Sequence, residues 1–204
     1  MKPLLFLIFF SYFFESPKKV SSSFSLKENL KSQKYCIDTL PYVDWSVNVD
    51  FEIGTIKGLS SYIGKKKYNE IKTQYYNELS FLNKKGDEIC QIGTYLFGNA
   101  TIRNIFIGYN KKESNKGKNV KKKYATGINH FSTNRMINLG IDEKKFLELS
   151  KSLNYKITFE NKMKIYEFSF LLPKESQYAG FNNEYLAVYT FENGKLKFIS
   201  ISCL

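Results

Sequence analysis

Three acidic side chains near the start of the chain have the types and spacing that acid–base chemistry needs. Asp44, Asp50 and Glu52 fall in a stretch in which apolar and polar residues alternate. On one strand, Asp50 and Glu52 would point to the same side about 7 Å apart, a separation that a two-carboxylate hydrolase uses. We favour a simpler interpretation, in which these acids lie on the solvent-exposed face of an edge strand, because the sequence indicates no pocket that would raise a carboxyl pKa.

The single histidine, His130, lacks the sequence context of a catalytic or metal site. No G-x-S-x-G motif supplies a nucleophile, and no second histidine offers metal-ligand spacing. Gly54, Gly58 and Gly64 fit neither the phosphate-loop pattern nor the dinucleotide-binding pattern, so they indicate turns. We therefore expect no catalytic residue, no metal and no cofactor, and we interpret His130 as a hydrogen-bonded structural residue.

Lysine carries nearly all of the positive charge in a chain whose formal net charge is +12. Residues 111–126 form a basic loop by composition, and its lysines are Lys111, Lys112, Lys116, Lys118, Lys121, Lys122 and Lys123. Such a loop can bind lipid head groups, a cell-wall polymer or an acidic protein surface. The alternative, which we favour, is a solvated loop that keeps the protein soluble. Arg103 and Arg135 are the only arginines, which argues against sequence-specific recognition of nucleic acid.

Three cysteines, Cys36, Cys90 and Cys203, leave at least one thiol unpaired within the chain. Cys90 and Cys203 both fall on predicted strands, so they are candidates for a disulfide between sheet neighbours. The alternative is that the cysteines are reduced and that two of them pack in the core as small apolar residues. Neither a C-x-x-C motif nor a Cys/His cluster is present, so a zinc site is not expected.

The first 25 residues have the pattern of a secretory signal peptide. Lys2 precedes an apolar run over residues 4–14, which is too short for a membrane-spanning helix. We expect cleavage near Ser25, a flexible leader over residues 26–38 and no transmembrane span after processing, with an uncleaved N-terminal anchor as the alternative. The mature protein would then be periplasmic or extracellular.

Residues 39–110 predict a lobe with the order strand, helix, strand, strand. Trp45 opens the cleanest alternation, over residues 45–53, and we place its ring in the core. Apolar residues at helical spacing predict a helix over residues 65–82, which ends at the basic turn Lys84-Lys85-Gly86. Two strands follow over residues 88–97 and 101–109.

Residues 127–204 predict a helix followed by antiparallel strands. Asp142 is a candidate N-cap, with Ile141 and Phe146 as a hydrophobic staple, for a helix over residues 142–153. Period-two patterns predict strands over residues 166–172, 185–191 and 196–202, and residues 156–159 add a short strand. Asn193-Gly194 predicts a type I′ hairpin turn. The fold class is therefore α+β, with a mainly antiparallel sheet and two helices on one face, in one domain or two small lobes.

The run over residues 137–142, the helix after it and the strands around Asn193-Gly194 resemble the modules of the SmpA/OmlA outer-membrane assembly lipoproteins and of the β-lactamase inhibitor protein. The resemblance covers the last third of the chain and departs from the pattern at a long insert over residues 173–183. It implies a protein that acts by binding other proteins. We expect an exported binding protein without catalytic activity that engages an envelope protein or a polyanion; the alternative is a cell-wall or polysaccharide hydrolase that uses the strand acids.

Overall fold

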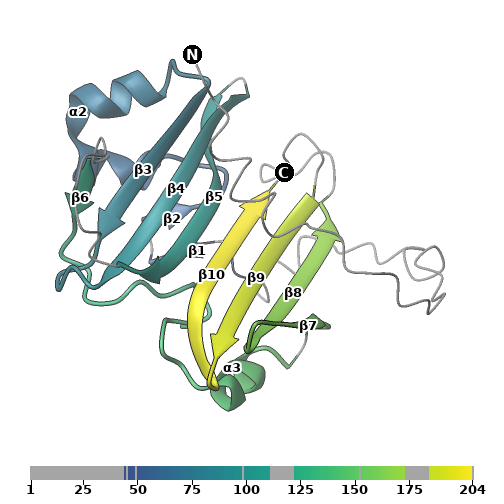
Figure 1. The fold of residues 1–204 in the computed structure, drawn as a ribbon. Helices are drawn as coiled ribbons and strands as arrows, with labels where there is room; N and C mark the ends of the chain where they lie inside the picture. Colours follow the sequence, from purple (N-terminus) through teal and green to yellow (C-terminus); the bar gives the residue numbers. More distant parts are fainter. Residues whose placement is uncertain are drawn as a thin grey trace. The chain divides into compact units, whose positions relative to one another are not determined.

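The computed structural model describes residue 44 and residues 46–48, 50–97, 99–110, 122–151, 153–172 and 184–203. The predicted signal peptide, the leader, Trp45, Cys36 and the insert over residues 173–183 lie outside these residues. Eight strands form one sheet in the order β6-β3-β4-β5-β10-β9-β8-β7 (Figure 1). Every neighbouring pair is antiparallel except β6 (Lys123–Ala125) and β3 (Tyr76–Leu82), which are parallel. The protein is α+β, and its sheet is largely but not purely antiparallel.

The two predicted lobes contribute adjacent halves of this one sheet. β3, β4 (Glu88–Phe97) and β5 (Asn99–Tyr109) form a meander in the N-terminal half. β7 (Lys156–Glu160), β8 (Met163–Leu171), β9 (Glu184–Glu192) and β10 (Lys195–Cys203) form the C-terminal half. β5 and β10 pair antiparallel and join the halves. The strands predicted for the C-terminal half are confirmed, and the turn at Asn193 and Gly194 has the positive φ angles that a type I′ turn needs.

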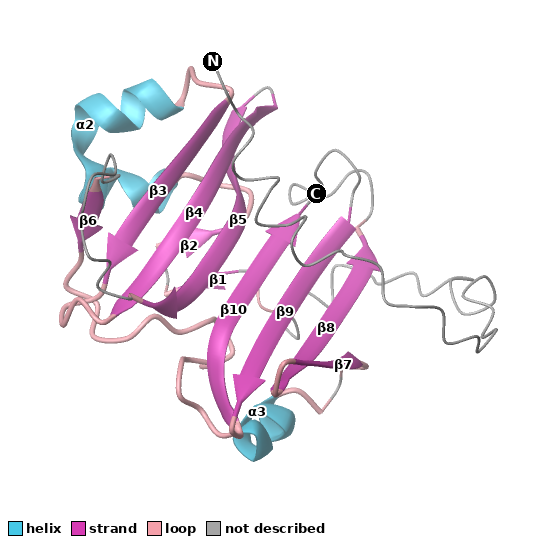
Figure 2. Ribbon diagram, viewed as in Figure 1, coloured by secondary structure: helices cyan, strands magenta, loops and turns pink. Residues whose placement is uncertain are grey.

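One face of the sheet carries the core, and both helices contact it (Figure 2). The strand register places Phe81, Cys90, Ile107, Ile199 and Tyr189 across this face, and all five side chains are buried. Tyr62 of α2 (Ser60–Ile71) packs against Phe81 in the N-terminal half. Phe146 of α3 (Glu143–Leu149) packs against Tyr166, Tyr189 and Phe191 in the C-terminal half.

The predicted helix over residues 65–82 is wrong in its second half. α2 ends at Ile71, and residues 76–82 form β3. Tyr75, Leu79 and Leu82 fit helical spacing, but Asn77, Leu79 and Phe81 also alternate, and all three of these are buried in the strand. Pairing with β4 decides between the two patterns, because a strand in the centre of a sheet buries its apolar side chains against more neighbours.

The strand predicted over residues 45–53 is also wrong as a single element. The chain reverses there, so Ser46–Val47 (β1) pairs antiparallel with Phe51–Glu52 (β2). Asn48 has a φ of 43° in the connection, a conformation that asparagine tolerates better than most residues. This small hairpin lies behind the sheet as drawn in Figure 1. Phe51 packs on Phe81 and Phe131, so the hairpin covers the core face of the N-terminal half.

The helix predicted over residues 142–153 begins where expected but ends at Leu149. Asp142 occupies the N-cap position, yet its carboxylate makes no capping hydrogen bond and instead pairs with Lys195 at 2.8 Å. Phe146 is buried and Ile141 is half-buried against the core. The apolar side chains, not the predicted cap, therefore hold this short helix on the sheet.

Candidate functional site

Asp44, the first of the predicted site acids, is enclosed in an ion pair. Its side chain is fully buried, and Arg135 donates to its two carboxylate oxygens from Nε at 3.1 Å and from Nη2 at 2.7 Å. Tyr189 donates its hydroxyl to Oδ2, and Tyr185 donates to the backbone carbonyl of Asp44. The acid is thus surrounded by donors and holds the chain near residue 44 against β9.

The charges of this cluster are fixed by its surroundings. Burial raises the pKa of the Tyr189 and Tyr185 phenols well above the ordinary value, and the charge of Asp44 adds to the effect, so both hydroxyls stay protonated and donate. Burial, the largest single influence, would lower the pKa of Arg135, but the hydrogen bond to Asp44 and the electrostatic interactions with Asp44 and the neighbouring tyrosines together outweigh it and raise that pKa above its usual value. The guanidinium of Arg135 therefore stays charged beside Asp44, although its Nη1 atom is buried without a hydrogen-bond partner among the described residues.

Asp50 and Glu52, the predicted carboxylate pair, do not lie on one strand face. Asp50 occupies the turn between β1 and β2, and its Oδ2 accepts a hydrogen bond from the Tyr62 hydroxyl at 2.5 Å. Burial, with the carboxylate of Asp50 beside it, raises the pKa of Tyr62 to about 12. The structure thus assigns Asp50 to the contact between the hairpin and α2, and the predicted geometry of two acids on a strand is wrong.

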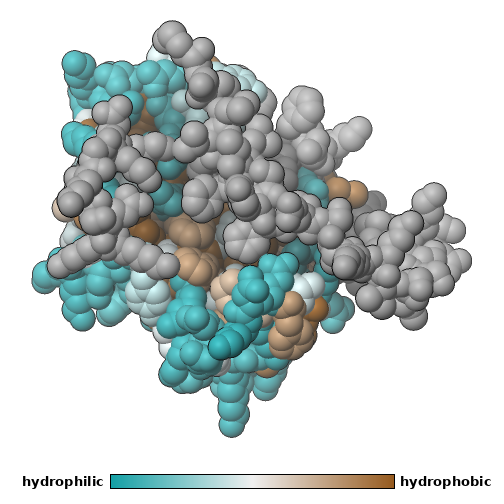
Figure 3. Space-filling view, viewed as in Figure 1, coloured by the Kyte–Doolittle hydropathy of each residue, from teal (hydrophilic) through white to brown (hydrophobic). Residues whose placement is uncertain are grey.

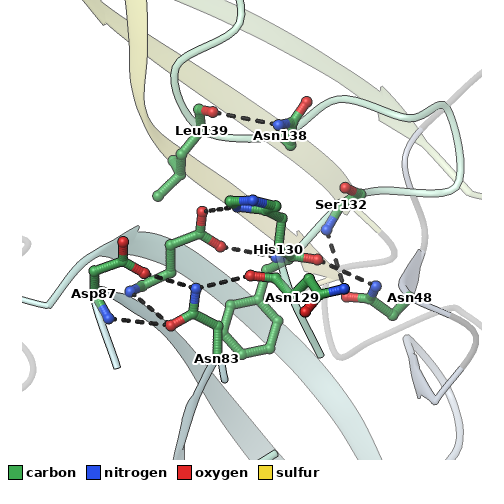
Figure 4. A network of polar contacts seen from close by, with 10 residues as sticks. Asn48, Asn83, Asp87, Asn129, His130, Ser132, Asn138 and Leu139 are labelled. Carbon is green, nitrogen blue, oxygen red and sulfur yellow. Dashed lines mark hydrogen bonds and ion pairs between the residues drawn. The ribbon is translucent and has the colours of Figure 1, made fainter. Parts of the chain in front are cut away.

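His130 takes part in a polar network that sequence reasoning missed (Figure 4). Its Nδ1 lies 2.8 Å from Oε1 of Glu88, whose other carboxylate oxygen accepts from the backbone N–H of Phe131 at 2.8 Å. Asn83 donates to the carbonyl of Asn129 at 2.9 Å and accepts from the backbone N–H of Glu88 at 3.1 Å. The network joins the β3–β4 turn to residues 129–131. The contacts from Asn83 and Glu88 to residues 129–131 each join positions more than 40 residues apart in the chain, so no local pattern signals them.

The Glu88–His130 pair matches the first two members of a catalytic triad, and the described residues supply no third. The Glu88 side chain is 5% exposed and that of His130 is 49% exposed. Among the described residues, no serine, threonine or cysteine side chain donates a hydrogen bond to the ring of His130. Through its other oxygen the same carboxylate holds the backbone N–H of Phe131, so Glu88 fastens residues 130–131 to β4; a purely structural role of His130 stays a prediction.

Of the seven lysines in the basic loop, only Lys122 and Lys123 are among the described residues; the other five lie outside them. Both side chains are exposed. The ammonium of Lys122 lies 4.8 Å from the centroid of the Tyr124 ring, and that of Lys123 donates to Asn110 at 2.9 Å. Lys122 immediately precedes β6, and Lys123 is its first residue. Because β6 is a terminal strand, these lysines place positive charge at one end of the sheet.

Cys90 and Cys203 are free and buried, so the predicted disulfide between them is wrong in this structure. They lie on β4 and β10, and β5 separates these two strands. Burial raises the pKa of both thiols, that of Cys203 to about 12. Protonated thiols without water access pack as small apolar groups, which is the alternative that the sequence left open.

The other end of the sheet has an exposed apolar edge on β7. Ile157 is 47% exposed and Phe159 is 74% exposed, and both lie on the face that carries α3. Apolar residues also appear at the position of β7 in the space-filling view (Figure 3). β7 is the last strand in the sheet order, and no described strand pairs with its outer side. An apolar edge strand of this kind is a template for pairing with another chain.

The register of the β7–β8 hairpin defines which backbone groups the edge presents. Asn161 and Lys162 both have positive φ angles and form a two-residue turn closed by Glu160 and Met163. In such a hairpin the closing pair is hydrogen-bonded, and bonded and non-bonded pairs then alternate. Glu160, Thr158 and Lys156 therefore bond to β8. The N–H and C=O groups of Ile157 and Phe159 point outward.

An ion pair lies next to the exposed ring of Phe159, on the side of β8 and α3. The Lys164 ammonium lies 5.6 Å from the Phe159 centroid and 2.5 Å from Oε1 of Glu143 in α3. Tyr166 also donates its hydroxyl to this carboxylate. The hydrogen bond from Lys164 lowers the pKa of Glu143, and the hydrogen bond from Tyr166 adds to this. The apolar edge is thus bordered by the Lys164–Glu143 ion pair.

No group of three or more His, Cys, Asp or Glu side chains in the described residues is placed to hold a metal ion. Within these ranges, no helix combines the length and the apolar character needed to cross a membrane. Comparison with protein-family models, with curated proteins and with solved structures found no match to this chain.

Proposed function

We propose that the protein is an exported, non-catalytic binding module that takes up an extended strand of a protein partner along the outer edge of β7. The observation that carries this proposal is the combination of Ile157 and Phe159, both exposed, with outward-facing backbone groups on a terminal strand. In strand addition, main-chain hydrogen bonds supply affinity and alternate side chains supply specificity. The export signal expected at the N-terminus and the resemblance to protein-binding modules agree with this function.

The other functions considered from the sequence have less support. The hydrolase hypothesis used Asp50 and Glu52 as a pair, and these residues belong to a turn and a two-residue strand. The polyanion hypothesis depends on lysines of which only Lys122 and Lys123 are described. The β7 edge combines its backbone and side-chain features in one place, and we therefore prefer a protein partner.

The test is a pair of substitutions at one edge position. Ile157→Pro removes an outward N–H and blocks the edge, while the bonds from Lys156 and Thr158 to β8 remain. Ile157→Thr changes the side chain to a polar one but keeps the N–H. In crosslinking pull-downs from the native envelope extract at low and high salt, we expect a partner retained at high salt by the wild type, retained less by Ile157→Thr and lost by Ile157→Pro.

A second readout connects the capture to the edge itself. In the captured complex, hydrogen exchange should protect the Phe159 amide, which points away from β8. Equal capture by all three proteins, or capture that high salt abolishes in all three, would contradict the proposal. Circular dichroism and thermal melts check that each variant is folded.

A further inference from the structure

We propose that the strand that pairs with β7 is β7 of a second copy of this chain, aligned antiparallel about a two-fold axis at Thr158. The inference rests on the proposed function, because it requires that the β7 edge accepts a strand. It goes further by naming the partner and the register.

The sequence of β7 is self-complementary in this register. Lys156 lies opposite Glu160 of the second copy, and Glu160 lies opposite Lys156 of that copy. On the other face of the strand, Ile157 of each copy lies opposite Phe159 of the other copy, which gives two apolar pairs. Opposite charges and pairs of apolar side chains at directly facing positions stabilise antiparallel strands. A two-fold interface requires a surface that complements itself in this way.

The backbone of β7 is compatible with the same register. Ile157 and Phe159 point their N–H and C=O groups outward, and the two-fold axis pairs Ile157 of one copy with Phe159 of the other. Each such pair can exchange both backbone hydrogen bonds, as a bonded pair in an antiparallel ladder does. Thr158 then faces its own counterpart as a non-bonded pair, because its backbone groups already bond to Ile165 of β8.

Neighbouring registers lose the match. A shift by one residue sets outward groups opposite inward groups, so the ladder cannot form. A shift that places Ile157 opposite Ile157 sets Lys156 opposite Thr158 and leaves the charges unpaired. The β6 edge offers no equivalent: Lys123, its exposed first residue, follows another lysine. Two copies meeting there would bring like charges together.

The expected dimer is weak. One short strand pair, with two exposed apolar side chains from each copy, buries far less than the roughly 1,200 Å² of a stable interface. We therefore expect reversible association that depends on protein concentration, detectable by sedimentation equilibrium in the range of about 10 μM to 1 mM.

Charge reversal tests the register. Lys156→Glu and Glu160→Lys should each weaken self-association about tenfold, because each sets like charges opposite each other. An equimolar mixture of the two variants should associate at least as well as the wild type, since every facing charge pair is again opposite in sign. Because Lys156 also lies 3.8 Å from Glu167 in its own chain, the Glu160→Lys variant gives the cleaner single measurement.

A crosslink tests the position of the axis. In a Cys36→Ser background, Thr158→Cys places two thiols at a non-bonded pair, where the Cα atoms are about 4.5 Å apart and a disulfide can form. We expect mild oxidation with glutathione disulfide to give covalent dimers of this variant. Ser169→Cys, an exposed position on the same face but on β8, is the matched control and should stay monomeric.

The proposed register would be overturned if the wild type and both charge variants associated to the same extent. Equal crosslinking at positions 158 and 169 would also overturn it. A wild type that stays monomeric throughout the concentration range would overturn the dimer. If in that case Ile157→Pro still abolishes capture of an envelope protein, the edge binds a different partner and the proposed function stands. If Ile157→Pro changes neither self-association nor capture, both proposals fail.

Discussion

Asp44 and Glu88 both hold chain segments against the same face of the sheet, but water reaches the two attachments to different extents. The Asp44 side chain is 0% exposed and its partner Arg135 is 9% exposed. Glu88 is 5% exposed, yet the ring of its partner His130 is 49% exposed. Arg135 and His130 belong to the connection that crosses the core face from β6 towards α3. The N-terminal part of this connection is therefore held by a contact that is half exposed to solvent, and the following part is held by a buried contact.

The two contacts are expected to contribute differently to the free energy of unfolding. A buried ion pair gains little over well-packed apolar groups, but the loss of one partner leaves a charge without compensation. A half-exposed pair loses less, because water replaces the missing group. The expected effects therefore follow the exposure of the acid, from Asp44 (0%) to Glu88 (5%) to Glu143 of the Glu143–Lys164 pair of α3 and β8 (25%).

The largest expected effect is that of Asp44→Asn. The amide has nearly the same shape but leaves the buried guanidinium of Arg135 without a counter-charge, so we expect a loss of about 3–5 kcal/mol in the free energy of unfolding. Urea denaturation measures this loss. The double variant Asp44→Leu/Arg135→Met, which removes both charges, should be more stable than Asp44→Asn. A loss below about 1 kcal/mol for Asp44→Asn would show that water reaches this pair.

The next effect is that of Glu88→Gln. Its neutral amide keeps one acceptor oxygen, so the Phe131 N–H and an Nδ1–H of the His130 ring can no longer both find an acceptor, and the group left over costs about 1–3 kcal/mol. Urea denaturation gives the free energy, and hydrogen exchange at the Phe131 amide shows which partner is lost. His130→Ala is the matched variant and should cost less, because half of its ring already faces solvent. Equal costs for both variants would contradict the ranking by exposure.

Local patterns were enough to predict most of the sheet. Alternation and the Asn193-Gly194 turn placed the strands of the C-terminal half, because each of these signals lies within a few residues of the element that it forms. The pattern failed where two periods coincide, as in residues 65–82, and where a turn interrupts an alternation, as at Asn48. There, burial against β4 and against Phe81 decides the structure, and neither contact can be inferred from the local sequence.

The polar contacts were harder to predict for the same reason. Arg135 and Asp44 are 91 residues apart, and Glu88 and His130 are 42 apart. One signal was present: Asp44 stands between Val43 and Trp45, and a charge in apolar surroundings requires a partner. With only two arginines in the chain, Arg135 was among few candidates for that partner.

The smallest expected effect lies at the Glu143–Lys164 pair and shows itself through pH. The pKa of Glu143 is lowered in the folded protein, chiefly by its hydrogen bond to Lys164. A carboxyl with a lowered pKa contributes stability above its unfolded pKa, about 4.3, and this contribution is lost as the pH falls through the folded value. Glu143→Gln should therefore lower the melting temperature at pH 6–7, whereas at about pH 3 the difference from the wild type should be smaller.

Glu148→Gln is the control for this titration, because Glu148 pairs with Lys145 at 3.3 Å on the exposed side of the same helix. An exposed pair three residues apart contributes a few tenths of a kcal/mol at most, so its variant should follow the wild type at every pH. If Glu143→Gln also follows the wild type, the charge pair beside β7 does not stabilise the fold. The position of α3 would then depend on its apolar contacts, chiefly those of Phe146, whose ring packs on Tyr166, Tyr189 and Phe191.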